Sequence, residues 1–395
     1  MTIVNQTGES KKSKANSNNG SIRKRSSGNW ELRWYGPVGL DGKSKRLSQI
    51  FKGTKKQATA KLRDLLKDVD DNKHVDKSKE TTSRLMSRFM KGHVAKECSL
   101  RTAQGYQGYI ERYIDRYIGS IPYQQLTGEH IDELYEFMMV ERGLSNTTII
   151  QLHRIIHKAF AWAIKRKLIS WNPADGATPP KRQKTQMPMW GAATIRQFLD
   201  ESKGTRYGHI FEFAVMMGLR RSEICGLKWD AVDLVGHRLE VKATLQQIRG
   251  HGLVTGAPKT QKSRRNFTLG PSTVELLQVV QGTQQLAKIE AGPVWKEEGY
   301  VFTQADGSPV LPGTLTENFR YLVRELEMPS LTFHGLRHAH VTMLLEEGIH
   351  PKVVSERLGH SNIDITMDTY SPVLPDLQEA AAQAVDERLG RLGGA

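Results

Sequence analysis

Alternating apolar and polar residues near the N-terminus predict a small β-sheet. In the stretch from residue 29 to 35, Trp30, Leu32 and Trp34 fall on one face of an extended chain. Asp41 and Gly42 then form a typical hairpin-turn pair. The segment Lys45–Phe51 follows as a basic second strand. The pattern therefore predicts a β-hairpin with one apolar face.

A helix over Lys55–Asp70 completes this first unit, because its apolar positions recur at helical spacing. We expect residues 27–72 to form one small domain in which the helix covers the apolar face of the hairpin. Residues 1–26 are rich in Asn, Ser, Gly and Lys. Such a segment has too few apolar residues to form a core, so we expect a disordered basic tail.

Residues 79–172 show helical periodicity throughout. One apolar stripe recurs at i, i+3, i+4, i+7, i+8 and i+11 and consists of Tyr106, Tyr109, Ile110, Tyr113, Ile114 and Tyr117. Thr127 is the expected N-cap of a helix through Met139, and Ser145 or Asn146 that of a helix to Lys167. These elements predict a helical bundle. The next stretch, 173–189, holds prolines and a basic run and is the expected interdomain linker.

From residue 190 to 375 the pattern changes to mixed helix and strand. An apolar helix over Ile210–Met217 should end at Gly218. Arg238–Leu245 alternates as one strand, glycines at 250, 252 and 256 predict hairpin turns, and Asn266–Leu269 predicts a further strand. The fold class is therefore multidomain and mainly α, with an α+β third domain.

The last part of this domain has the pattern of a helix-turn-helix. Gly348 should end one helix, Pro351 should begin the next, and Gly359 should end that one. Residues 376–395 form a tail in which Asp376 is the expected N-cap of a helix to Leu389. Its apolar face is small and largely alanine, so it needs a partner surface, on its own chain or on a second copy.

The charge of the chain indicates which kind of molecule it binds. The chain has 57 Lys and Arg against 42 Asp and Glu, a formal net charge of +15, and residues 1–61 alone hold 14 basic against 3 acidic residues, a balance of +11. A basic surface binds polyanions and releases their counterions. Two cysteines, Cys98 and Cys225, give no disulfide framework or metal spacing. No apolar run is long enough to span a bilayer, so we expect a cytoplasmic protein without a membrane partner.

The candidate nucleic-acid contacts are basic residues on the expected surfaces. A β-ribbon can lie in a DNA groove, and residues off the apolar stripe of a helix can meet phosphates. The candidates are Arg33, Lys43, Lys45 and Arg46 on the first sheet, Arg112 and Arg116 on the bundle, Lys181, Arg182 and Lys184 in the linker, and Arg264 in a basic loop.

The densest chemistry lies between residues 334 and 370. His334, Arg337, His360 and Tyr370 place two imidazoles, a guanidinium and a phenol in fewer than forty residues, without a matching set of carboxylates. Guanidinium groups bind phosphate oxygens, histidines move protons near neutral pH, and a tyrosine can act as a nucleophile. His334 and His338 also have metal-ligand spacing, but a general base and a third ligand are missing, so we predict no metal. His338 and His340 are expected to pack or to lie on the surface.

These residues resemble the C-terminal signature of the tyrosine recombinases, the phage-integrase family. The resemblance rests on Leu358-Gly359-His360 and Asp368-Thr369-Tyr370, and it extends to Gly218-Leu219-Arg220-Arg221-Ser222-Glu223. It implies that Arg220, Lys259, His334, Arg337, His360 and Tyr370 are catalytic and that Glu223 orients Arg220. Arg221 is the alternative to Arg220, and Lys262, in the same basic segment, is the alternative to Lys259.

The resemblance implies an integrase that cleaves and rejoins DNA through a 3′-phosphotyrosine bond, without a cofactor, to integrate or excise a mobile element. Residues 27–72 are similar to an arm-type DNA-binding domain, 79–172 to a core-binding domain, and 190–375 to the catalytic domain. The implied partners are core and arm-type attachment sites in double-stranded DNA, a homotetramer on that DNA, and a DNA-bending accessory or excision factor. The expected location is the nucleoid of a bacterial host cell. A type IB topoisomerase and a non-catalytic helix-turn-helix regulator are the alternatives.

Overall fold

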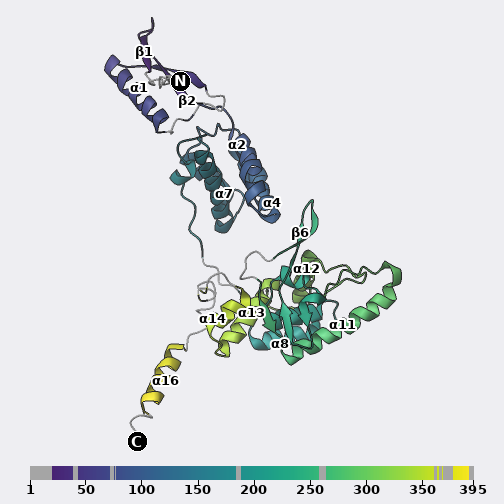
Figure 1. The fold of residues 1–395 in the computed structure, drawn as a ribbon. Coiled ribbons are helices and arrows are strands. Elements are labelled where there is room, and N and C mark those ends of the chain that lie inside the picture. The colour runs from purple at the N-terminus through teal and green to yellow at the C-terminus, as the bar shows by residue number, and fades with distance from the viewer. Residues whose placement is uncertain are drawn as a thin grey trace, which may run out of the picture. The chain divides into compact units, whose positions relative to one another are not determined.

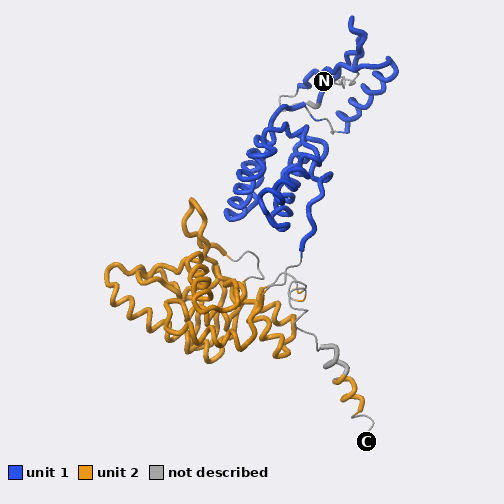
Figure 2. The backbone as a smooth tube through the Cα atoms, turned by 180° about the vertical axis from the view of Figure 1, so that it is seen from behind, with its two compact units in different colours: residues 1–184 blue, residues 185–395 orange. Residues whose placement is uncertain are grey.

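The computed structural model describes residues 20–38, 43–71, 75, 77–183, 188–257, 264–359, 363, 367 and 377–390. The chain divides into two compact units, residues 1–184 and 185–395 (Figure 2). Separate hydrophobic clusters lie within each unit, and each unit is described by itself below. No helix in the described ranges is long and apolar enough to cross a membrane.

The first unit begins with a three-stranded antiparallel sheet covered by one helix (Figure 1). The strands β1 (Ser21–Lys24), β2 (Trp30–Val38) and β3 (Ser44–Phe51) lie in that order, and α1 spans Lys55–Asp70. Leu32 and Trp34 are buried against Ala58 and Leu62 of α1. The predicted strands and helix are thus confirmed, and the alternation seen in the sequence faces the core.

Strand β1 corrects one expectation. Residues 1–26 were expected to be disordered because they are polar, but Ser21–Lys24 pairs with β2, with Ile22 opposite Leu32. Backbone hydrogen bonds to β2 stabilise this short edge strand, and Ile22 is its one apolar residue in the core. An edge strand with so few apolar residues gives almost no hydrophobic pattern.

The helical part of the first unit follows the predicted order. Its elements are α2 (Thr82–Phe89), η1 (Met90–Val94), α3 (Ala95–Glu97), α4 (Leu100–Tyr109), η2 (Ile110–Ile114), α5 (Asp115–Tyr117), α6 (Gly128–Val140), α7 (Asn146–Lys165) and η3 (Pro173–Gly176). Thr127 and Ser145 cap α6 and α7. The predicted apolar stripe is one continuous helix, α4 to α5, with a π-helical turn at η2.

The expected linker from residue 173 begins later than predicted. Pro173–Gly176 forms the 3-10 turn η3, and Ala174 is buried in the core of the bundle. The backbone N–H of Thr178 donates to Asp132 on α6 at 2.7 Å. These contacts make the start of the proline-rich stretch a part of the helical unit.

The second unit is a helical domain with small sheets. Its elements are α8 (Ala192–Ser202), α9 (Gly208–Met217), α10 (Arg221–Cys225), η4 (Trp229–Ala231), β4 (Val232–Asp233), β5 (Arg238–Glu240), β6 (Thr244–Ile248), β7 (Gly252–Gly256), β8 (Asn266–Thr268), α11 (Pro271–Ala291), η6 (Gly292–Val294), α12 (Pro312–Glu325), α13 (Phe333–Glu346), α14 (Pro351–Leu358) and α16 (Leu377–Gly390). One sheet has the order β4-β5-β8, and β6 pairs with β7.

The single strand predicted over Arg238–Leu245 is wrong in one respect. The chain forms two strands there, β5 and β6, which belong to different sheets. Leu239, Val241 and Leu245 are all buried, as the alternation predicts. The alternation therefore holds as far as Val241, but Thr244 is buried beside Leu245, and the chain leaves the first sheet between the two strands and enters the second.

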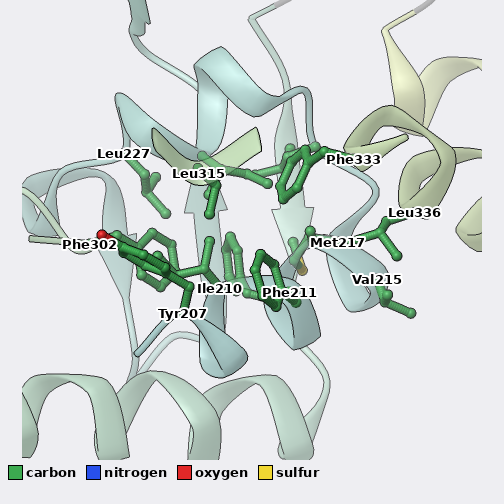
Figure 3. Packing of buried hydrophobic residues seen from close by; sticks show 14 of the residues in the cluster. Tyr207, Ile210, Phe211, Val215, Met217, Leu227, Phe302, Leu315, Phe333 and Leu336 are labelled. Carbon is green, nitrogen blue, oxygen red and sulfur yellow. The ribbon is translucent and has the colours of Figure 1, made fainter. Parts of the chain in front are cut away.

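Aliphatic and aromatic side chains together fill the main core of the second unit (Figure 3). Phe319 of α12 packs edge-on against Phe211 of α9 and Phe333 of α13, with ring centroids 5.5 Å and 5.7 Å apart. Such pairs add about 0.5–1.5 kcal/mol each beyond the area that they bury. They fix α9 and α13 relative to each other. Helix α13 carries His334 and Arg337, and the turn after α9 leads to Arg220.

Candidate active site

The junction of α9 and α10 positions the first arginine. Gly218 ends α9 with φ of 61°, a left-handed conformation that favours glycine. A Cβ atom at this position would lie 2.4 Å from Cδ2 of His340, so a larger residue would also clash. Leu219 is buried next, and Arg220 follows as the N-cap residue of α10. The tight turn thus brings Arg220 directly to the end of a buried helix.

Glu223 orients Arg220, as the i, i+3 spacing predicts. Its Oε1 accepts from Nη1 of Arg220 at 2.9 Å, and its Oε2 accepts from the backbone N–H of Arg220 at 2.9 Å. The Glu223 side chain is only 2% exposed, whereas that of Arg220 is 35% exposed. The arginine is therefore held from its buried side while its other side reaches solvent.

Arg337 on α13 is buried and joins two other helices. Its Nη1 donates to the carbonyl of Gly218 at 2.7 Å and its Nη2 to the carbonyl of Leu358 at 2.8 Å. Carbonyls at helix C-termini lack partners within the helix and attract cations. Arg337 therefore ties the ends of α9 and α14 together.

The two guanidinium groups meet at the C-terminal end of α14. Nη2 of Arg220 donates to the carbonyl of Gly359 at 3.2 Å, next to the Leu358 carbonyl that Arg337 holds. Gly359 caps α14 in the left-handed conformation, φ 65°, which confirms the predicted helix end.

His334 lies one turn before Arg337 at the start of α13. Its side chain reaches solvent, but loss of water around the ring and the positive charges nearby, including Arg337 and Arg220, lower its pKa to about 4. The imidazole is therefore neutral at pH 7. The ring of His338 stands perpendicular to it, 4.9 Å between centroids. In the described part of the chain, no group of three or more His, Cys, Asp or Glu side chains is arranged to bind a metal.

His340 is a packing residue, one of the two roles expected for it. It is 5% exposed, its Nδ1–H donates to the carbonyl of Val215, with 2.8 Å between the two atoms, and its Nε2 accepts from Nε of Arg357 at 3.3 Å. These two partners require the neutral ring. Burial, followed by the charge of Arg357, lowers its pKa to about 4.

Acidification should therefore destabilise the second unit through His340. The unfolded chain binds a proton below its ordinary pKa of about 6.5, but the folded chain does so only near 4. The contribution is complete above pH 6.5 and is lost as the pH falls towards 4, a change of roughly 3 kcal/mol. Urea titrations of the full chain at pH 7, 6 and 5 should show this loss, and His340→Gln should reduce its pH dependence. His251→Gln, in the exposed β6–β7 turn, is the control; an equal slope in all three proteins would contradict this role.

Arg265 was not among the sequence candidates, although the structure buries it in this site. Its side chain is 7% exposed and forms a fork to Glu223, Nη1 to Oε1 at 3.0 Å and Nη2 to Oε2 at 2.8 Å. One signal was present in the sequence. In an alternating strand, Arg265 shares the face of Phe267 and Leu269, both of which are buried. An arginine on a core face needs a buried acidic partner.

The remaining predicted catalytic residues of this unit are either placed elsewhere or not described. Arg221, the alternative to Arg220, donates from Nη1 to the hydroxyl of Thr316 on α12. Lys259, Lys262, His360 and Tyr370 lie outside the described residues. The turn of the β6–β7 hairpin is at residues 249–251, and β7 ends at Gly256.

The described candidate DNA contacts are exposed except Arg33, which is half-buried and pairs with Glu31. On the first sheet, Arg33 and Arg46 lie on the face away from α1, with the exposed ring of Tyr35. Lys45 lies on the opposite face, in step with Leu47, so the four predicted residues do not share one surface. The remaining exposed candidates are Lys43, Arg112, Arg116, Lys181, Arg182 and Arg264, and Lys184 is not described.

Comparison with known proteins gives a consistent result. Residues 191–375 match the profile of the phage integrase family. The chain is 28% identical over 375 residues to a protein of Caldanaerobacter subterraneus subsp. tengcongensis named tyrosine recombinase XerC-like, covering 89% of this chain and 94% of that one. It is 24% identical over 288 residues to the ICEBs1 integrase of Bacillus subtilis, covering 72% and 77%. The Tn1549 transposon integrase, solved in complex with a circular intermediate DNA, shares the fold with a TM-score of 0.67 at 23% identity, covering 78% of this chain and 99% of that one.

Proposed function

This chain is a tyrosine recombinase of the phage integrase family, and we propose that it integrates or excises a mobile element through a covalent bond between Tyr370 and a 3′ phosphate of DNA. The observation that carries this proposal is the meeting of Arg220 and Arg337 at the end of α14. Two guanidinium groups from separate helices, beside a neutral histidine, form a site suited to a phosphate.

The proposed reaction is a transesterification. The hydroxyl oxygen of Tyr370 attacks the scissile phosphorus, and the bond from phosphorus to the 5′ oxygen breaks. In this proposal His334 accepts the proton of the phenol, and Lys259 gives a proton to the leaving 5′ oxygen. Arg220 and Arg337 stabilise the additional negative charge on the phosphorane, and His360 donates to a non-bridging oxygen.

Rejoining reverses these steps. The 5′ hydroxyl of a partner strand attacks the phosphotyrosine, and Tyr370 leaves with a proton. One phosphodiester bond is exchanged for another at each step, so the reaction balances without a nucleotide or a redox cofactor. The similarity to recombinases over most of the chain favours this function over DNA relaxation by a type IB topoisomerase and over a helix-turn-helix regulator.

We also propose how the chain meets its substrate. Residues 27–72 bind arm-type sites, residues 79–172 and residues 190–375 each bind the core site, and four copies assemble on two core sites. A DNA-bending or excision factor would set the direction of the reaction in the nucleoid of the host cell. The net charge of +15 and the exposed basic residues of the first unit support binding to DNA.

A suicide substrate tests the proposed function. Nicked duplexes tiling the DNA that flanks the coding sequence would be incubated with the full chain, because a nick releases a short fragment and traps the covalent intermediate. We expect a protein–DNA adduct that resists SDS and forms with only a few of the duplexes. Absence of an adduct with every duplex would contradict the proposal.

Deleting residues 1–76 should separate the two kinds of DNA contact. We expect weaker binding to arm-type sites and a smaller dependence of affinity on salt, because the deletion removes lysines and arginines that neutralise phosphates. Cleavage of the core site should persist, since residues 190–375 hold the proposed catalytic groups. Gel-shift titrations at several salt concentrations measure both effects. An unchanged arm-site affinity would show that residues 27–72 are not the arm-binding domain.

A further inference from the structure

Arg265 connects three elements of the second unit from a buried position. It lies immediately before β8, its fork binds Glu223 on α10, and its Nε donates to the carbonyl of Arg357 on α14 at 2.7 Å. The guanidinium also lies over the ring of Phe267, 5.1 Å from its centroid. With 7% of the side chain exposed, Arg265 is covered by protein and is not a direct ligand for DNA.

Glu223 is shared between two arginines. Each of its oxygens accepts two hydrogen bonds: Oε1 from Arg220 and Arg265, and Oε2 from Arg265 and the backbone N–H of Arg220. Burial by itself would raise the pKa of this carboxyl group, but the hydrogen bonds and charges of Arg265 and Arg220 hold the pKa below its usual value. Glu223 is therefore an ionised, fully bonded carboxylate, with Arg265 as its bidentate partner.

This sharing of Glu223 determines how many hydrogen-bond donors of Arg220 are available to a ligand. In the described part of the chain, Arg220 gives Glu223 one side-chain hydrogen bond and the carbonyl of Gly359 another. A guanidinium has five N–H donors, so most of its donors stay available on the exposed side. Because the Arg265 guanidinium binds both oxygens of Glu223, the Arg220 guanidinium makes only one hydrogen bond to that carboxylate.

We propose that Arg265 is a positioning residue for cleavage, which acts by satisfying Glu223 so that the Arg220 guanidinium remains directed at the scissile phosphate. The proposal rests on the proposed recombinase function. Without Arg265, the buried Glu223 carboxylate would have Arg220 as its single cationic partner and would form a bidentate pair with it. Arg220 would then turn towards Glu223 and away from the phosphate.

The test compares Arg265→Gln, Arg265→Lys and the double variant Glu223→Gln/Arg265→Gln in the full chain. The probe is the suicide duplex that gives most adduct with the unaltered protein, and the readouts are the single-turnover cleavage rate, the Kd for the same duplex without its nick, and the unfolding midpoint. Arg238→Gln is the matched control, because it removes a guanidinium from β5, the neighbouring strand of the same sheet. If the Arg238→Gln protein cleaves at nearly the rate of the unaltered protein, then losing a positive charge on this sheet does not by itself slow cleavage.

We expect Arg265→Gln to slow cleavage roughly 10²-fold, the scale of a misplaced catalytic group, with Kd changed only a few-fold. Arg265→Lys should be intermediate, since it keeps the charge without the fork. The double variant should cleave at least about tenfold faster than Arg265→Gln, because a neutral side chain at position 223 does not capture Arg220. A purely structural role for Arg265 would give no such recovery.

Several results would overturn the proposal. Cleavage by Arg265→Gln at the unaltered rate would do so, as would a double variant no faster than the single one. Loss of folding in both Arg265→Gln and Arg265→Lys would show that the residue acts as a scaffold. If instead the unaltered protein forms no adduct with any duplex, the proposed function itself fails, and this outcome is distinct from the others.

Discussion

Tyr370→Phe will abolish the covalent protein–DNA adduct while leaving DNA binding nearly unchanged. The substitution removes one oxygen atom, the proposed nucleophile, and leaves the aromatic ring. Arg220 and Arg337 still hold the end of α14, so the phosphate-binding groups remain in place. The measurement is SDS-gel detection of adduct with a suicide duplex, alongside a gel shift for affinity.

Tyr321→Phe provides the matched control for this substitution. Tyr321 lies on α12 in the same unit with 54% of its surface exposed, and losing its hydroxyl should leave cleavage intact. Adduct formation by the Tyr370→Phe protein would show that another residue is the nucleophile. A large loss of DNA affinity would show that the phenol contributes mainly to binding.

Arg220→Ala should slow cleavage of a normal phosphodiester by roughly 10²–10³-fold, the usual effect of removing one group that stabilises transition-state charge. The reason is electrostatic, so the effect should shrink when the scissile phosphate is replaced by an uncharged methylphosphonate. Such a phosphorus centre develops less negative charge and needs less cationic support. Single-turnover rates on the two duplexes measure this difference.

Arg221→Ala distinguishes the two adjacent arginines. Arg221 bonds to Thr316, whereas Arg220 meets Glu223 and Gly359, so the Arg221 variant should cleave within a few-fold of the unaltered protein. If the Arg221→Ala protein cleaves as slowly as the Arg220→Ala protein, the assignment of the catalytic role to Arg220 alone is wrong. An equal defect of Arg220→Ala on both duplexes would indicate a structural rather than an electrostatic role.

Local signals in the sequence predicted much of this site. Gly218 as a helix end, Arg220 two residues after it and Glu223 three residues later form a short local pattern, and the structure has the contact that this spacing predicts. The same holds for α13 and α14, whose ends follow from Gly348, Pro351 and Gly359. Helix caps and turns can be predicted from the sequence because the residues that interact lie close together in the chain.

Long-range contacts were not accessible in the same way. The pair of Arg265 and Glu223 joins residues 42 positions apart, and no local pattern links a basic loop to that carboxylate. Strand β1 was missed because a polar edge strand is stabilised by backbone pairing, which leaves little trace in side-chain pattern. The division of Arg238–Leu245 between two sheets depends on where each strand finds its partner, and this is a property of the assembled fold.

The most direct test of the account is the identity of the atoms joined in the adduct. The full chain would be trapped on an end-labelled suicide duplex, digested with nuclease and protease, and analysed by mass spectrometry. We predict a peptide containing Tyr370 that carries a nucleotide through its 3′ phosphate, and a free 5′ hydroxyl on the released strand. A nucleotide on any other residue, or a linkage through a 5′ phosphate, would contradict the proposed mechanism.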